Sequence, residues 1–149
     1  MGLTETINDD LKIAMKSGDS IKLNTIRSIR SRIIELSKRG TGAGITTEEE
    51  LTILLSEAKK RKEAFEMYQK AGRTDLSDQE QRELEIINEY LPKQMSRDEA
   101  VEIVKKIIIE AGAGTAKDFG KIMPAVMKEL KGKIDGKVVQ EVVRQQLGE

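Results

Sequence analysis

The sequence has no cysteine, no histidine and no tryptophan among its 149 residues. Without cysteine there can be no disulfide framework, no thiol nucleophile and no thiolate metal site. Without histidine the commonest general base and metal ligand is missing, so a histidine-based catalytic triad is excluded. Metal-free phosphate chemistry and carboxylate-bound magnesium stay open, but since no motif points to either, we predict no catalytic residues, no metal site and no cofactor.

Aromatic residues and prolines are also scarce. Two Phe, two Tyr and two Pro are the only ones in the chain. A hydrophobic core must therefore be built from Leu, Ile, Val, Met and Ala, which favours the packing of helices over a β-sandwich. The apolar residues recur at steps of three and four rather than two. Both observations predict an all-α protein.

Neither sign of charge is in excess, since 26 basic residues balance 26 acidic ones. A general electrostatic attraction to nucleic acid is therefore not indicated. The distribution is slightly uneven, with a net charge of −2 over residues 1–92 and +2 over residues 93–149. No apolar run approaches the length that crosses a membrane, and the first residues do not resemble a signal peptide. We expect a cytoplasmic protein without a membrane partner.

The helix signals predict two helical subdomains, residues 1–92 and residues 93–149. Four helices are expected in the first, and three in the second. The boundary is placed at Leu91 and Pro92, because a residue before proline avoids the helical conformation. This pair is a candidate hinge. The predicted helices cover residues 4–16, 21–39, 47–72, 75–90, 96–111 and 116–130, with a last one after residue 135.

Several cap and break signals refine these helices. Capping boxes are expected at Thr47 with Glu50 and at Ser96 with Glu99. Asp19 or Ser20 is expected to cap the second helix, and Asp135 the last one. Pro124 stands inside the sixth helix and should either kink it or divide it into two.

The sharpest candidate site is a set of lysines near glycines in the last third of the chain. Glycine allows close backbone approach and exposes amide donors, which suits contact with an RNA backbone. Lysine also favours helix C-termini that glycine ends, so an ordinary helix-end explanation stays open beside the RNA-binding one. The candidate residues are Lys117, Lys121, Lys128, Lys131, Lys133 and Lys137.

A secondary basic face is predicted on the second helix at Arg27, Arg30 and Lys38. Six basic residues and one acidic residue occur between positions 22 and 39, which would suit phosphate contact. Pairing with acidic residues of the third helix is the alternative. By contrast, we interpret the run of positive charge at residues 59–62 as a solvated helix surface, because its charges point in different directions and glutamates lie nearby.

Three segments together resemble the YqeY-like family of small bacterial proteins. They are Tyr90-Leu91-Pro92-Lys93-Gln94-Met95, residues 117–123 and residues 131–139. The resemblance extends essentially from end to end. That family shares its C-terminal module with the tail of the B subunit of aspartyl/glutamyl-tRNA amidotransferase, a carbon–nitrogen ligase that uses glutamine as amido-N-donor. The resemblance implies a two-part helical fold and a tail that looks like a tRNA-binding appendage.

We therefore expect an accessory module that binds tRNA, or a tRNA–enzyme complex, through the C-terminal lysines. The alternative is a helical adaptor for a protein partner, in which the first four helices offer a groove. An enzyme in its own right has the least support, because no nucleophile with an adjacent base is found.

Overall fold

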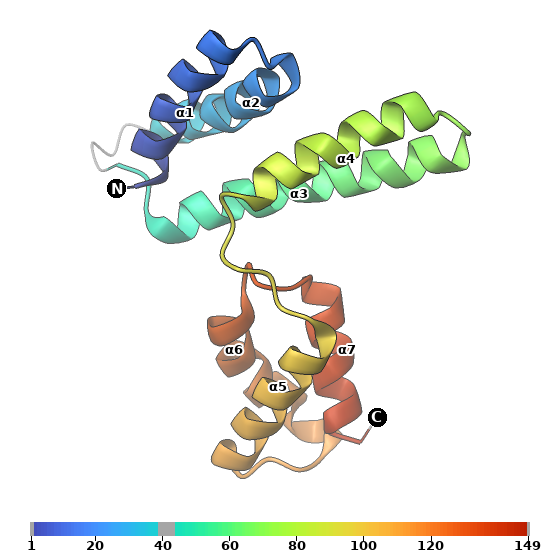
Figure 1. The fold of residues 1–149 in the computed structure, drawn as a ribbon. Helices are drawn as coiled ribbons and strands as arrows, with labels where there is room; N and C mark the ends of the chain where they lie inside the picture. The colour runs from blue at the N-terminus through green and yellow to red at the C-terminus, as the bar shows by residue number, and fades with distance from the viewer. Residues whose placement is uncertain (1, 39–43, 149) are drawn as a thin grey trace. The chain divides into compact units, whose positions relative to one another are not determined.

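The computed structural model describes residues 2–38 and 44–148, which form seven α-helices and one short 3-10 turn (Figure 1). No strand occurs in this part of the chain, so the all-α prediction is confirmed. The chain divides into two compact units, Met1–Leu91 and Pro92–Glu149. Each unit has its own apolar core, and each is described by itself.

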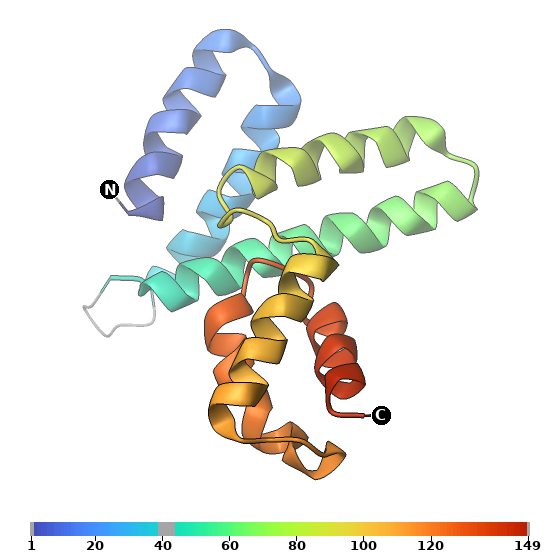
Figure 2. The same cartoon turned by 60° about the horizontal axis from the view of Figure 1, so that its bottom comes forward.

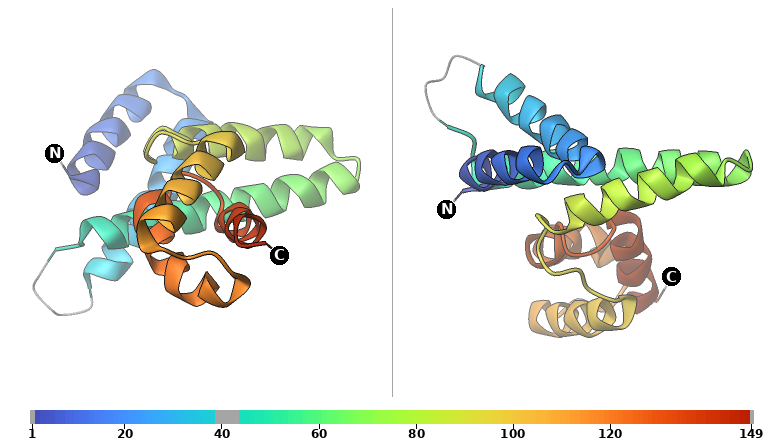
Figure 3. Two further views of the ribbon diagram at one scale, coloured as in Figure 1. Left: turned by 90° about the horizontal axis from the view of Figure 1, so that it is seen from below. Right: turned by 45° about the horizontal axis from the view of Figure 1, so that its top comes forward.

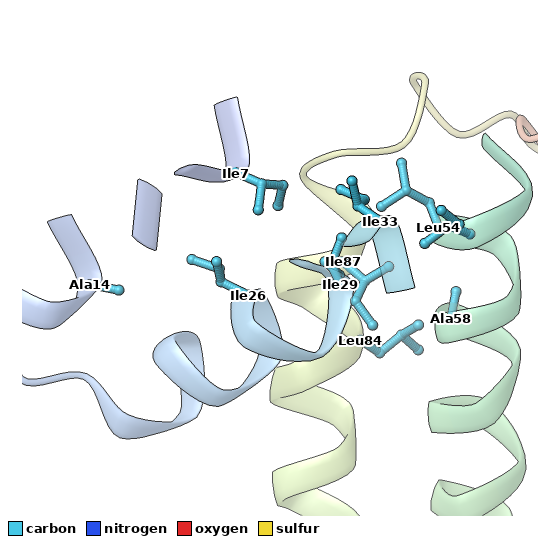
Figure 4. Packing of buried hydrophobic residues seen from close by; sticks show 10 residues of the cluster. Ile7, Ala14, Ile26, Ile29, Ile33, Leu54, Ala58, Leu84 and Ile87 are labelled. Atoms are coloured by element: carbon cyan, nitrogen blue, oxygen red, sulfur yellow. The ribbon is translucent and has the colours of Figure 1, made fainter. Parts of the chain in front are cut away.

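The first unit consists of two helical hairpins. Helices α1 (Leu3–Ser17) and α2 (Ser20–Ser37) form the first hairpin, and α3 (Thr47–Lys70) and α4 (Thr74–Asn88) form the longer second one (Figure 2). Helix α2 also contacts α3 and α4, so it joins the two hairpins. Its isoleucines Ile26, Ile29 and Ile33 are buried, with Ile26 facing α1 and Ile29 lying beside Leu84 and Ile87 of α4 (Figure 4).

The second unit is a three-helix bundle with a short turn. It contains α5 (Arg97–Ala111), the 3-10 turn η1 (Ala116–Asp118), α6 (Phe119–Leu130) and α7 (Gly136–Gln146), seen from two further directions in Figure 3. Each pair of these α-helices is in contact. The buried residues are aliphatic, as the scarcity of aromatics requires. The sixth helix was predicted from residue 116, but its first three residues form the 3-10 turn.

The helix caps explain where most of these elements begin. Asp19 caps α2, because its carboxylate accepts a hydrogen bond from the Lys22 backbone N–H at 3.1 Å. Ser96 accepts one from the Glu99 N–H at 3.2 Å, and Asp135 accepts one from the Lys137 N–H at 2.9 Å. The predicted break over residues 40–44 falls mostly outside the described residues.

The capping box of α3 lies one residue earlier than predicted. Thr46 Oγ1 accepts from the Glu49 N–H at 3.1 Å, and the Glu49 carboxylate accepts from the Thr46 N–H at 3.0 Å. The predicted pair, Thr47 with Glu50, is therefore wrong. Two successive threonines before three glutamates fit the pattern in either register, and the sequence alone does not distinguish them.

Pro124 does not divide its helix, so of the two alternatives the division into two short helices is wrong. Helix α6 is a single element from Phe119 to Leu130 with Pro124 inside it. The missing N–H removes the bond that the Gly120 carbonyl would accept. Both Gly120 and Pro124 are exposed, so water can reach that carbonyl.

Tyr90 fastens the end of the first unit to its beginning. Its hydroxyl donates to Asp10 Oδ2 at 2.5 Å, across 80 residues of sequence. Burial, followed by the hydrogen bond to the Asp10 carboxylate, raises the pKa of Tyr90 far above its ordinary value. Tyr90 and Leu91 also pack against the first core. Leu91, the first residue of the candidate hinge, therefore belongs to the first unit, and a hinge motion stays a prediction.

We predict that Tyr90→Phe lowers the free energy of unfolding by about 2 kcal/mol, because the Asp10 carboxylate loses a donor in a half-buried site. Urea denaturation measures the change. Tyr68→Phe is the matched control, since the half-buried Tyr68 makes no hydroxyl hydrogen bond within the described residues. Equal effects of the two substitutions would contradict the assigned role of the Tyr90–Asp10 hydrogen bond.

Candidate nucleic-acid interface

Three of the predicted lysines follow one side of α6 and the turn before it. Lys121 and Lys128 are exposed and seven residues apart, which places them on the same face about 10 Å from each other along the axis. Lys117 is exposed in η1, four residues before Lys121. Within the described residues none of the three makes an ion pair with a carboxylate. Their charge is therefore available to a ligand.

Helix α7 adds a second line of positive charge. Lys137 is exposed in its first turn, and Arg144 is exposed seven residues later on the same face. The Arg144 guanidinium lies 5.0 Å from the ring centroid of Phe119, the first residue of α6. This contact brings the end of α7 to the lysine-bearing start of α6. Our sequence analysis missed Arg144, although its spacing from Lys137 could have indicated it.

The loop between α6 and α7 is closed by the segment before α5. Gly132 is buried with a φ of +83°, and its carbonyl accepts a hydrogen bond from the Gln94 side-chain amide at 2.8 Å. The same amide donates to the Pro92 carbonyl at 2.8 Å, and the Met95 N–H donates to the Lys133 carbonyl at 2.7 Å. Gly132 thus serves the fold and does not expose its backbone to a partner.

The remaining two predicted lysines, Lys131 and Lys133, belong to this closed loop. Both are half-buried. Their backbone N–H groups donate to the carbonyls of Met127 and Leu130, at 3.0 Å each. The loop therefore has few free amides for an anion. The structure brings the six lysines to one helix, its two flanking turns and the start of the next helix.

The turn before α6 is organised by Asp118. Its carboxylate accepts hydrogen bonds from the backbone N–H groups of Gly114 at 3.1 Å and Thr115 at 3.3 Å. These backbone hydrogen bonds, with smaller contributions from the Thr115 hydroxyl and Lys121, hold the pKa of Asp118 below its ordinary value. The carboxylate occupies the amides that an external anion would otherwise use, so the side chains of Lys117 and Lys121 carry the attraction.

The secondary basic face lies in the first unit. Arg27 and Arg30 are exposed on α2, and Lys38 is exposed at its C-cap. Arg30 Nε donates to the Asn8 side chain of α1 at 3.0 Å. Within the described residues no ion pair joins the three to the acidic residues of α3. Arg39, which belongs to the same basic stripe, lies outside the described residues, so pairing of the stripe with α3 stays an alternative. The face lies on a different unit from the C-terminal lysines.

A buried ionic cluster in the first unit was missed by the sequence analysis. Glu57 of α3 is 1% exposed and accepts a hydrogen bond from Ser28 Oγ of α2 at 3.1 Å, and one from Arg61. Arg61 Nε lies 3.7 Å from the carboxylate of Glu83 on α4, and Lys60 lies 3.6 Å from Glu57. The solvated-surface interpretation of residues 59–62 was therefore wrong for Arg61, whose side chain is 12% exposed. The spacing of Glu57 and Arg61 from the buried Leu54 and Ala58 was the available signal.

The charges in this cluster shift two pKa values in opposite directions. Burial favours the neutral form of Glu57, but Arg61, the hydrogen bond from Ser28 and Lys60 outweigh it and hold the pKa of Glu57 below its usual 4.5. Burial, together with the neighbouring Glu83, raises the pKa of Glu80. No group of three or more acidic side chains in the described part of the chain is arranged to hold a metal ion. The cluster therefore acts as an internal tie between α2, α3 and α4.

Comparison with known proteins decides the family. The family model described as "Yqey-like protein" matches residues 4–147. The chain belongs to the YqeY-like family. It is 33% identical over 146 residues to "Altered inheritance of mitochondria protein 41, mitochondrial" of Pyrenophora tritici-repentis, covering 93% of this chain and 77% of that protein. It is 30% identical over 94 residues to "Uncharacterized protein C22F3.15" of Schizosaccharomyces pombe, covering 63% and 76%.

These two relatives bear on the source and the location of the protein. One relative is named as mitochondrial, so a bacterial source and a cytoplasmic location stay predictions for this chain. No helix in residues 2–38 and 44–148 is both long and apolar enough to cross a membrane.

Gln94→Ala should destabilise the second unit by about 2 kcal/mol, because the Pro92 and Gly132 carbonyls both lose their donor. Hydrogen exchange of amides in α6 and α7 would report the loss locally. Lys93→Ala is the control, since its exposed side chain neighbours Gln94. If both variants exchange like the parent chain, Gln94 does not hold the loop.

Glu57→Gln should lower the free energy of unfolding at neutral pH by about 3 kcal/mol, because it leaves the charge of Arg61 in a mostly buried site. The folded pKa of Glu57 lies below its unfolded value, so its stabilisation is present above pH 4.5 and is lost as pH falls through the folded pKa. The stability difference between parent and variant should therefore shrink in acid, where urea denaturation can measure it.

Glu63→Gln is the matched control for this substitution. Glu63 lies on the same helix in an exposed 4.0 Å ion pair with Lys59, which contributes little to stability. The raised pKa of Glu80 makes stability change with pH in the opposite direction to the lowered pKa of Glu57. Glu80 is present in the parent chain and in both variants, so it does not affect the comparison. A difference between parent and Glu57→Gln that is constant with pH would contradict the assignment.

Proposed function

We propose that this protein is an accessory RNA-binding module that contacts tRNA, alone or in complex with an enzyme, through its second unit. The observation that carries the proposal is the exposed line of Lys117, Lys121 and Lys128 on one side of α6 and its preceding turn, none of which makes an ion pair within the described residues. Lys137 and Arg144 extend the positive surface on α7. Lysine and arginine side chains of this kind neutralise phosphates and release counterions.

The arrangement favours backbone contact over base recognition. Lysine binds phosphate as a point charge on a flexible stem. The only aromatic ring in the second unit is Phe119, which is half-buried and already covered by Arg144. Stacking of unpaired bases on aromatic rings, which gives many RNA modules their sequence preference, therefore has little support here. We infer recognition of folded RNA by shape and charge.

Membership of the family is compatible with this role and does not require catalysis by the chain. The family's association is with a glutamine-dependent carbon–nitrogen ligase, in which the shared module resembles an appendage. In the described residues the acidic groups with lowered pKa values, Glu57, Asp75 and Asp118, each accept hydrogen bonds from other groups of the chain. Any amidation chemistry therefore belongs to a partner enzyme in this proposal.

The test is fluorescence anisotropy with labelled bulk tRNA over a range of salt concentrations. Four lysines contacting phosphates predict a slope of log K against log salt of roughly −3 to −4. Reversing Lys117, Lys121, Lys128 and Lys137 to Glu should abolish binding at low salt. The loss should be uniform across tRNA species, because the contacts carry no base information.

The control reverses four exposed lysines of the first unit, Lys12, Lys16, Lys62 and Lys70. Both variants change the net charge by the same amount, so general electrostatic repulsion is equal in the two. Retained binding in the control and lost binding in the first variant support the proposal. Equal losses, or no binding of the parent chain at low salt, would overturn it.

A further inference from the structure

A groove of about 210 Å³ opens between α1 and α2, on the first unit. Ile7, Ile33 and Ile34 form its apolar floor, and Asn8, Arg30 and Lys38 stand on its rim. No acidic residue occurs among the described residues that line it. Ile34 is 37% exposed although its neighbours Ile7 and Ile33 are buried. The groove therefore combines an accessible isoleucine with two cations.

The two cations flank Ile34 symmetrically along the helix. Arg30 lies four residues before it and Lys38 four residues after it, one turn or about 6 Å away on each side of the same face. The hydrogen bond from Arg30 to Asn8 fixes the guanidinium across the groove without neutralising it. Within the described residues neither cation makes an ion pair with a carboxylate.

The volume and the lining residues of the groove distinguish between its possible occupants. The volume is below the range of about 300–1,000 Å³ that is typical of small-molecule sites. A nucleic-acid backbone could satisfy the cations, but it would leave the apolar floor facing phosphates and water. An amphipathic helix laid along the groove satisfies both, since its apolar side chain covers the isoleucines while its acidic residues meet the cations.

We propose that the α1–α2 groove binds an amphipathic helix of a protein partner, with a bulky apolar residue flanked by acidic residues one turn before and one turn after it. The apolar residue contacts the exposed part of Ile34, which lies beside the buried Ile7 and Ile33 in the groove lining. The two carboxylates pair with Arg30 and Lys38. The sequence analysis kept a protein-adaptor role as an alternative but did not indicate what kind of partner would bind. The lining of the groove indicates the chemistry of that partner. This role is separate from RNA binding by the second unit.

The proposal can be tested on the full chain with a fluorescein-labelled helical peptide of about 18 residues, long enough to form a helix on binding. The peptide carries Leu at its centre and Glu four residues to either side. Anisotropy should show saturable binding that weakens at high salt. Ile34→Glu should reduce the affinity by about tenfold or more, because it places a carboxylate on the apolar floor.

Ile13→Glu is the matched control. Ile13 is 60% exposed on the opposite side of α1 from Thr4, which lines the groove. This variant should bind the peptide as the parent does, and circular dichroism checks that both variants are folded. A charge-swap pair gives a second reading: Lys38→Glu should weaken binding, and a peptide with Lys in place of the matching Glu should restore it.

Three outcomes would overturn the proposal. They are no saturable binding up to about 1 mM peptide, equal losses in Ile34→Glu and Ile13→Glu, and no recovery in the charge swap. The binding of bulk tRNA to the same variants tests the competing occupant, a nucleic-acid backbone. If Ile34→Glu weakens tRNA binding as much as the peptide, the groove belongs to an RNA surface and the peptide proposal falls. Unchanged tRNA binding with lost peptide binding supports it.

Discussion

The arrangement of the first unit depends on a carboxylate that has almost no contact with water. Glu57 is 1% exposed at the place where α2, α3 and α4 meet. A lone buried charge would cost several kcal/mol, so the hydroxyl of Ser28 and the guanidinium of Arg61 must reach it from two helices. Arg61 in turn lies against Glu83 of α4. This requirement fixes the helices in one register, which aliphatic packing alone specifies less sharply.

Helix class, the approximate helix bounds and most caps could be predicted because they depend on local patterns. Steps of three and four in the apolar residues, and Asp19 or Ser96 before a helix, act within one turn. The capping box of α3 was placed one residue late because neighbouring residues satisfied the same pattern. The ionic cluster was missed because a charged side chain is read as exposed unless its partners from other helices are known.

In the candidate site, too, local features could be predicted from the sequence and contacts between distant residues could not. Lys117, Lys121, Lys128 and Lys137 are exposed, as a binding role requires. The glycine that seemed to open the backbone to a partner is instead buried under Gln94, a contact across 38 residues that spacing cannot reveal. Two recognisable segments of the family resemblance, residues 90–95 and 131–139, are thus partners in one structural contact. Their distinctiveness reflects the fold, while the charges on α6 and α7 carry the proposed function.

The amide of Gln94 also determines where the chain can be cut. Because it donates to Pro92 on one side and to Gly132 on the other, the residues before α5 are a structural part of the second unit. A fragment that begins at Ser96, the first residue suggested by the helix cap, would lack both donors that close the α6–α7 loop. A fragment designed to carry the second unit intact has to start no later than Pro92, several residues ahead of its first helix.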